Sequence, residues 1–162
     1  MFYQDVLAAL QAAGARYVLV GGVAVILHGV PRTTADIDIV IDLASDNVLA
    51  VVAALTALGF VPRNPVNARD LADPDMRRGW IEDKGMRAFA FHRPGRPLDG
   101  VDILFDAPLD YQALVANVEL LTADGLVIPL ASARDLIALK EFAGRAQDVA
   151  DIDALRRILG AG

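Results

Sequence analysis

Residues 18–42 constrain the fold more than any other stretch of the sequence. An apolar run ends at Gly21 and Gly22, a short apolar segment follows, and a polar loop then leads to Asp36 and Asp38. Glycines at a helix entrance permit positive φ and leave the first-turn amides open, which is typical of an anion site. The pattern therefore predicts a strand, a phosphate-binding turn, a short helix and a second strand.

The second predicted strand carries two carboxylates on one face. Asp36 and Asp38 project together because side chains alternate along a strand. Like charges this close raise one pKa unless a cation intervenes, and Mg²⁺ is commonly held by carboxylates together with substrate phosphates. A glycine turn followed fourteen residues later by Asp-x-Asp suits metal-assisted phosphoryl or nucleotidyl transfer. An ordinary tight turn followed by a solvated edge strand is the other explanation that the residues leave open.

Composition bounds the class of protein. The 162 residues, 55% of them hydrophobic, suit one domain over 1–162, with a core at about 1–106 and a mostly helical part at about 107–162. Without a long apolar run or a basic leader, we expect no membrane segment and a cytoplasmic location. The sequence has no cysteine and two distant histidines, so any metal would be bound by oxygen.

Charge is unevenly distributed along the sequence. The net charge of −6 argues against nonspecific coating of nucleic acid. Residues 63–96, in contrast, contain eight basic and five acidic side chains. This segment is either a solvated insertion or a basic rim that holds a triphosphate or an RNA end beside an acidic metal site.

Periodicity predicts the remaining elements. Helices are expected at residues 2–13, 45–57, 111–116, 133–142 and about 147–159. Strands are expected at 17–20, 36–42, 60–61 and 101–106, with a hairpin of 119–122 and 126–129. Strands at 80–83 and 87–93 are predicted to form another hairpin, followed by an exposed turn over 93–100. The last helix is expected to pack Val149, Ile152, Leu155 and Leu159 inward.

The glycine pair and the Asp-Ile-Asp strand resemble the signature of the polymerase-β-like nucleotidyltransferase superfamily. The resemblance implies an α/β (α+β) nucleotidyltransferase fold, in which helices flank a small, mixed, twisted sheet and the C-terminal segment is helical. It also implies a third carboxylate on a neighbouring strand. Asp102 matches that residue, because it faces away from Val101 and Ile103 on a strand otherwise suited to burial.

Lys140 falls near the apolar face of the predicted helix 133–142, where it either snorkels to solvent or points into the site. Residues 135–152 resemble the C-terminal segment of small bacterial toxin-type nucleotidyltransferases related to abortive-infection systems (AbiEii-like). The resemblance implies that Lys140 contacts a nucleotide phosphate. Arg145 and Asp148 match the same pattern, with Asp148 as an orienting partner.

These patterns predict a Mg²⁺-dependent enzyme that transfers a nucleotide from an NTP to a hydroxyl of an RNA end, a protein or a small molecule. Asp36, Asp38 and Asp102 are expected to be catalytic and to bind Mg²⁺, or alternatively Mn²⁺. The expected nucleotide-binding residues are Gly21, Gly22, Arg32, Thr34, Lys140 and Arg145. Expected partners are an NTP, a tRNA or protein acceptor, and a cognate antitoxin. The alternative is a catalytically weak, nucleotidyltransferase-like protein that binds a nucleotide or a partner.

Overall fold

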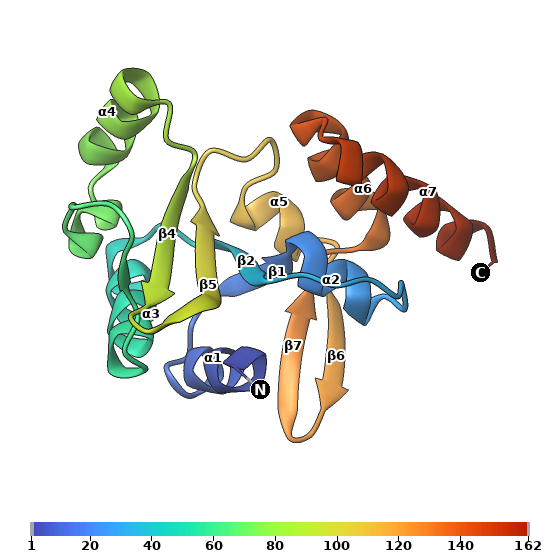
Figure 1. Ribbon diagram of the computed structural model, residues 1–162, viewed down its shortest axis with the longest axis horizontal. Helices are drawn as coiled ribbons and strands as arrows, with labels where there is room; N and C mark the ends of the chain where they lie inside the picture. The colour runs from blue at the N-terminus through green and yellow to red at the C-terminus, as the bar shows by residue number, and fades with distance from the viewer. Residues whose placement is uncertain (1, 162) are drawn as a thin grey trace.

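A mixed sheet of seven strands runs through the centre of the molecule (Figure 1). The computed structural model describes residues 2–161. In spatial order the strands are β3 (Val61–Pro62), β4 (Ala88–Arg93), β5 (Arg96–Leu104), β2 (Asp36–Ile41), β1 (Tyr17–Val20), β7 (Leu126–Leu130) and β6 (Glu119–Ala123). The pairs β2·β5 and β1·β7 are parallel and the others antiparallel. The predicted mixed sheet is therefore confirmed.

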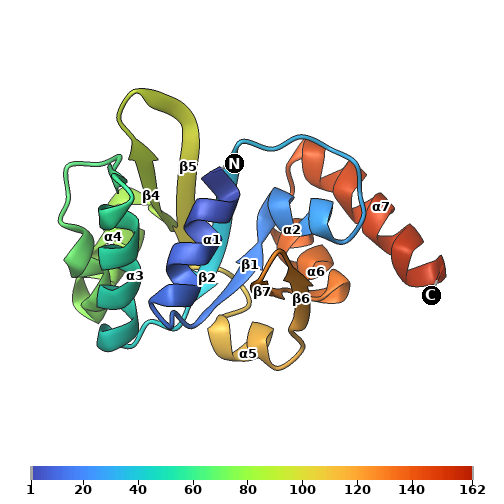
Figure 2. The ribbon, with the colours of Figure 1, turned by 90° about the horizontal axis from the view of Figure 1, so that it is seen from below.

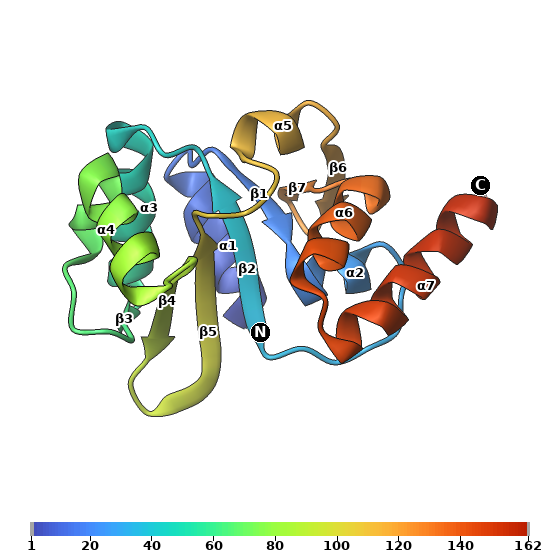
Figure 3. The same cartoon turned by 90° about the horizontal axis from the view of Figure 1, so that it is seen from above.

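Helices cover both faces of this sheet. They are α1 (Phe2–Ala12), α2 (Gly21–Leu27), α3 (Ser45–Ala57), the short 3₁₀ helix η1 (Ala68–Ala72), α4 (Pro74–Lys84), α5 (Tyr111–Val115), α6 (Ala133–Ala143) and α7 (Ala146–Ala161). Seen from below, α1 and α3 lie across one face (Figure 2). Seen from above, β5 and β2 are visible between α4 on one side and α6 and α7 on the other (Figure 3).

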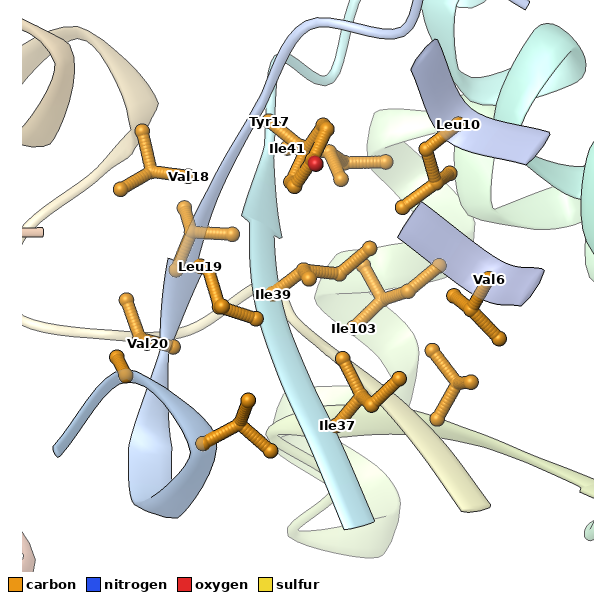
Figure 4. Close-up of a cluster of buried hydrophobic side chains, with 14 of the residues drawn as sticks. Val6, Leu10, Tyr17, Val18, Leu19, Val20, Ile37, Ile39, Ile41 and Ile103 are labelled. Atoms are coloured by element: carbon orange, nitrogen blue, oxygen red, sulfur yellow. The ribbon is translucent and has the colours of Figure 1, made fainter. Parts of the chain in front are cut away.

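The central strand β2 separates a buried face from a polar face. Ile37, Ile39 and Ile41 are buried and pack with side chains of α1, β1 and β5 (Figure 4). Asp36 and Asp38 alternate with them and point to the other face. Because β2 pairs with β1 on one side and β5 on the other, the explanation of a solvated edge strand is wrong.

A buried asparagine fixes the end of β1 and β2 that lies away from these carboxylates. Asn47 of α3 accepts a hydrogen bond from the Arg16 N–H at 2.8 Å. Its amide donates to the carbonyls of Arg16 at 3.0 Å and of Asp42 at 2.7 Å. Arg16 precedes β1 and Asp42 follows β2, so one side chain ties both strand ends to α3.

The predicted strand at 80–83 is wrong, because these residues form the last turns of α4. Asp73 caps this helix by accepting a hydrogen bond from the Asp75 N–H at 2.9 Å, and Pro74 occupies the first turn. Gly85 ends it in the left-handed conformation at φ +62°. The buried Trp80 packs against Phe89 with ring centroids 5.5 Å apart. The cap and proline thus outweigh the short apolar pattern around Trp80.

The strand β4 forms its hairpin with β5 and not with residues 80–83. This hairpin includes most of the predicted exposed turn. The pairing continues to Arg93 and Arg96, and Asp99 and Gly100 at its base are buried. The remaining helices and the hairpin of β6 and β7 are confirmed, with Ser132 capping α6 as a hydrogen-bond acceptor for the Asp135 N–H.

The packing predicted for the last helix is half correct. Ile152 and Leu155 are buried, whereas Val149 and Leu159 are exposed. The apolar stripe of α7 is therefore narrower than predicted, and it packs against α6 and the loop before β2. Among the described residues, no helix combines the length and apolar character needed to cross a bilayer.

Candidate active site

The register of two parallel strands brings the predicted carboxylates together. Asp38 of β2 is the Cα partner of Asp102 of β5, and Asp36 is the partner of Gly100. Asp38 and Asp102 line the same two cavities, and Asp36 lines one of them. The sequence thus predicted a cluster that the fold does assemble, although its two halves lie more than sixty residues apart.

Two glycines make room for this cluster. A Cβ at Gly21 would overlap the carboxylate of Asp38, and a Cβ at Gly100 would overlap that of Asp36. Gly21 also has φ +70°, which L side chains rarely adopt. Gly100 has no such backbone requirement, so its role is purely steric. Sequence reasoning did not find Gly100, because only the register of β5 against β2 shows which residue faces Asp36.

Burial and mutual repulsion hold protons on the carboxylates. Burial, followed by the charges of Asp102 and Asp36, raises the pKa of Asp38 to about 7. Burial and the charge of Asp36 also raise the pKa of Asp102, although a hydrogen bond with Asp38 and the positive charge of Arg63 oppose the shift. A divalent cation would relieve this repulsion, which makes the cluster chemically suited to one.

The donor set fits a hard cation, because it consists of carboxylate oxygens. Within residues 2–161, no three ligand-type side chains already converge closely enough to chelate an ion. Small side-chain rotations of Asp36, Asp38 and Asp102 would therefore accompany cation binding. These three are the residues that could hold a metal here.

The loop after α2 brings Gly22 together with Arg32 and Thr34. A Cβ at Gly22 would lie 2.7 Å from Oγ1 of Thr34 and 3.2 Å from Cζ of Arg32. The predicted nucleotide-binding residues at the start of α2 and in this loop are thus in direct contact. The helix α2 begins at Gly21 itself and has no side-chain cap.

Lys140 neither snorkels nor reaches freely into the site. Its side chain is buried, and its Nζ lies 2.9 Å from Asp151 Oδ2 and 3.4 Å from Asp148 Oδ1. Asp151 also pairs with Arg32, so one carboxylate joins α6, α7 and the loop before β2. Two buried acids explain why a lysine can lie on an apolar helix face.

Arg145 is the exposed member of this ion network. Its Nε donates to Asp148 Oδ2 at 3.0 Å, yet 74% of its side chain is exposed. Burial alone would raise the pKa of Asp148, but the hydrogen bonds from Arg145 and the charge of Lys140 lower it below its usual value. Asp148 is therefore an anionic anchor for both cations, as the predicted orienting role requires.

Two cavities meet at Asp38, Asp102, Lys140 and Arg145. The polar one, of about 170 Å³, lies toward Asp36 and is lined by Gly22, Arg32, Thr34, Ala35, Asp36, Gln147, Asp148 and Asp151 as well. The other, of about 370 Å³, lies toward the end of β5. Its further lining is mainly apolar and includes Leu104, Ala107, Pro108, Leu136, Leu139, Phe142 and Ala143. All nine predicted site residues line one or both cavities.

The basic segment 63–96 contributes two arginines to the surroundings of the site. Arg87 lines the apolar cavity, with its guanidinium 5.6 Å from the Phe142 ring centroid. Arg63 lies near Gly100 and acts electrostatically on Asp102. Other basic residues of the segment have local partners, such as Arg93 on Asp99 at 2.8 Å. The segment is thus a part of the sheet and its flanking helices, and Arg63 and Arg87 are its basic residues near the carboxylate cluster.

The fold and site define a nucleotidyltransferase: a glycine turn and an Asp-x-Asp strand face a third aspartate and a cationic pocket. The chain belongs to the family described as "Nucleotidyl transferase AbiEii toxin, Type IV TA system", which it matches over residues 5–161. The predicted AbiEii-like resemblance is therefore confirmed. No curated protein is similar enough in sequence to match.

Solved structures support the same fold. The chain is similar to the lincomycin-bound lincosamide antibiotic adenylyltransferase LnuA, with 18% identity and a TM-score of 0.63 over 97% of this chain and 94% of that one. It is also similar to the antibiotic-resistance factor ANT(2'')-Ia, with 14% identity and a TM-score of 0.60 over 98% of this chain and 83% of that one.

Gly100→Ala should disturb the site more than the fold. The added methyl group displaces the Asp36 carboxylate, so we expect Mg²⁺-dependent NTP binding to weaken by about tenfold or more and stability to fall by about 1–3 kcal/mol. Calorimetry and urea unfolding measure the two effects. Gly79→Ala in α4 is the control, because its Cβ would meet only Asp83 at 3.8 Å. Equal binding by both variants would contradict the steric role of Gly100.

Lys140→Ala and Arg145→Ala should separate stability from binding. Removing Lys140 leaves two buried acids short of a cation and should cost about 2–4 kcal/mol, since Arg32 and Arg145 still pair with them. Removing the exposed Arg145 should change stability by less than about 1 kcal/mol but lower NTP affinity by roughly tenfold. Unfolding and calorimetry on both variants test this, and an unchanged stability of Lys140→Ala would refute the buried network.

The raised pKa of Asp38 sets a pH dependence for stability. The native carboxyl keeps its proton up to about pH 7, while the unfolded chain releases it near pH 4. The native state then binds more protons in this interval, so the free energy of unfolding should fall as pH rises through it. Asp38→Asn should flatten this slope when unfolding is measured in EDTA, whereas the exposed Asp153→Asn should not. A wild-type slope in Asp38→Asn would show that Asp38 titrates normally.

Proposed function

We propose that this nucleotidyltransferase is Mg²⁺-dependent and transfers a nucleotide from an NTP to a hydroxyl of an RNA end, a protein or a small molecule. The observation that carries the proposal is the pairing of Asp38 with Asp102 between a polar, cation-lined cavity and an apolar one. The triphosphate of an NTP is charged, whereas its nucleoside is much less polar. We therefore assign the triphosphate to the polar cavity and the nucleoside to the apolar cavity.

The chain's own groups suit the charge changes of the reaction. The hydroxyl oxygen forms a bond to the α-phosphorus, and the bond from that phosphorus to the bridging oxygen breaks, so pyrophosphate leaves with the electron pair. Arg145, Arg32 and the amides of Gly21 and Gly22 are placed to bind the phosphates. Asp102, once deprotonated, can accept the hydroxyl proton at a carboxylate oxygen.

Asp36, Asp38 and Asp102 would hold the cation, which neutralises phosphate charge and activates the hydroxyl when bound. The same three carboxylates favour a catalyst over a protein that only binds nucleotides. Binding alone does not need a cluster of acids in which burial and repulsion raise the pKa of Asp38 to about 7. Mn²⁺ has a similar preference for oxygen ligands and could replace Mg²⁺.

The biological role we propose is that of the toxin in a type IV toxin–antitoxin pair, with a cognate antitoxin as partner. This rests on the family to which the chain belongs. A tRNA, a protein or a small molecule can each present a hydroxyl acceptor. The chain shares its fold with a lincosamide antibiotic adenylyltransferase, which keeps a small-molecule acceptor among the candidates.

Labelled nucleotide transfer tests the function. Wild-type protein with Mg²⁺ and each α-³²P-labelled NTP should label RNA or protein in a mixed acceptor pool, and EDTA should stop it. Asp38→Asn should reduce the rate by at least about a hundredfold, because it removes a carboxylate from the cation site. Its stability in EDTA should hold or rise, since the substitution relieves repulsion.

The proposal fails if no NTP binds at about millimolar concentration, which is far weaker than ordinary substrate affinity. It also fails if Asp38→Asn transfers label at the wild-type rate. Asp153→Asn, an exposed aspartate of α7, is the matched control and should be fully active.

A further inference from the structure

Arg63 approaches the carboxylate cluster from the β3 edge of the sheet. It follows β3, and its backbone N–H donates to the Ala90 carbonyl at 2.9 Å. Ala90 is the Cα partner of Asp102, and Asp102 is the partner of Asp38. These four residues therefore form one row across the sheet, with the two carboxylates at one end and the arginine at the other.

The small side chain of Ala90 lets the guanidinium of Arg63 extend along this row. A Cβ built on Gly100 would lie 3.4 Å from Nη2 of Arg63 and next to the Asp36 carboxylate. The positive charge of Arg63 also opposes the rise in the pKa of Asp102. The guanidinium is thus close enough to affect the cluster without contacting it directly.

Arg63 differs from the cations on the opposite side of the cluster. Arg32 and Lys140 pair with Asp151, and Arg145 pairs with Asp148. Arg63 is exposed, and among the ion pairs within residues 2–161 none includes it. Its hydrogen-bonding capacity is therefore available to a ligand.

The geometry of transfer indicates which part of the substrate lies near Arg63. Attacking and leaving oxygens are roughly in line at the phosphorus. If pyrophosphate leaves toward Arg145 and the α6–α7 side, the attacking hydroxyl comes from the opposite side of Asp38 and Asp102. On that side of Asp102 the sheet continues through Ala90 of β4 to Arg63.

We propose that Arg63 binds an anionic group of the acceptor and thereby selects acceptors with a phosphodiester next to the attacking hydroxyl. An arginine suits this role because its planar donors match two phosphate oxygens at once. The inference rests on the proposed function, since that function defines the acceptor side of the cluster. It adds a specificity-determining residue from the basic segment 63–96, for which the sequence indicated only a general binding role.

A purely structural role for Arg63 makes a different prediction. An arginine that only neutralises Asp36 and Asp102 would change cation and nucleotide binding when it is removed. An acceptor-binding arginine would affect the binding of charged acceptors far more than the binding of the cation and the nucleotide. Separate measurements of NTP binding and of acceptor binding therefore distinguish the two roles.

The test compares two probes that differ in one charge. One is the dinucleoside monophosphate ApA, and the other is its neutral methylphosphonate analogue. Calorimetry on the full chain, with Mg²⁺ and a non-hydrolysable α,β-methylene NTP present, should show about tenfold tighter binding of ApA by the wild type. Arg63→Ala should abolish this preference and Arg63→Lys should keep part of it, and neither should change the affinity for the NTP analogue as much as the affinity for ApA.

Arg78→Ala is the matched control, because Arg78 is an exposed arginine of α4 whose ion pair is with Asp75. It removes the same charge away from the cluster and should keep the preference for ApA. The inference is overturned if the wild type binds neither probe or both equally, if Arg63→Ala keeps the preference, or if it weakens NTP binding equally. A missing Mg²⁺ dependence of NTP binding would instead refute the proposed function, while the comparison of the two probes still reports on Arg63.

Discussion

Repulsion between carboxylates on neighbouring parallel strands is the constraint on which the site depends. The register of β2 and β5 places Asp38 beside Asp102, and burial prevents water from screening the two charges. The fold accommodates this by surrounding the cluster with small residues and cations. Gly21 and Gly100 leave space for the carboxylates, while Arg63 and Arg145 act on them from opposite sides.

The cations beside the cluster are themselves held by acids, so the proposed phosphate site is shaped before any ligand arrives. Asp151 fixes Arg32 and Lys140 in relation to each other, and Asp148 does the same for Lys140 and Arg145. A buried network of this kind contributes less to net stability than to a single geometry, because desolvation offsets much of the attraction. Its main effect here is to position donors, which lowers the conformational entropy lost on binding.

The sequence predicted what is local. The glycine turn, the Asp-Ile-Asp alternation and the cap of α6 depend on neighbours in the chain, and all three are confirmed. What failed or was missed depends on tertiary contacts. The burial of Trp80 on a helix, the acids that hold Lys140, and the approach of Arg63 to Asp102 follow from packing and strand register that periodicity does not encode. The resemblance to a known family pointed to Lys140 but not to its buried surroundings.

The order of the elements along the chain has a consequence for synthesis. The strands β2 and β5, which carry the three acids, precede β7, α6 and α7 in the sequence, and these later elements bring Lys140, Asp148 and Asp151 to the pocket. While the ribosome is still extending the chain, β2 and β5 can display their acids, but Lys140 and its anchors are not yet in place. A nascent chain that ends before α7 therefore lacks the acids that hold Lys140, and its pocket is incomplete.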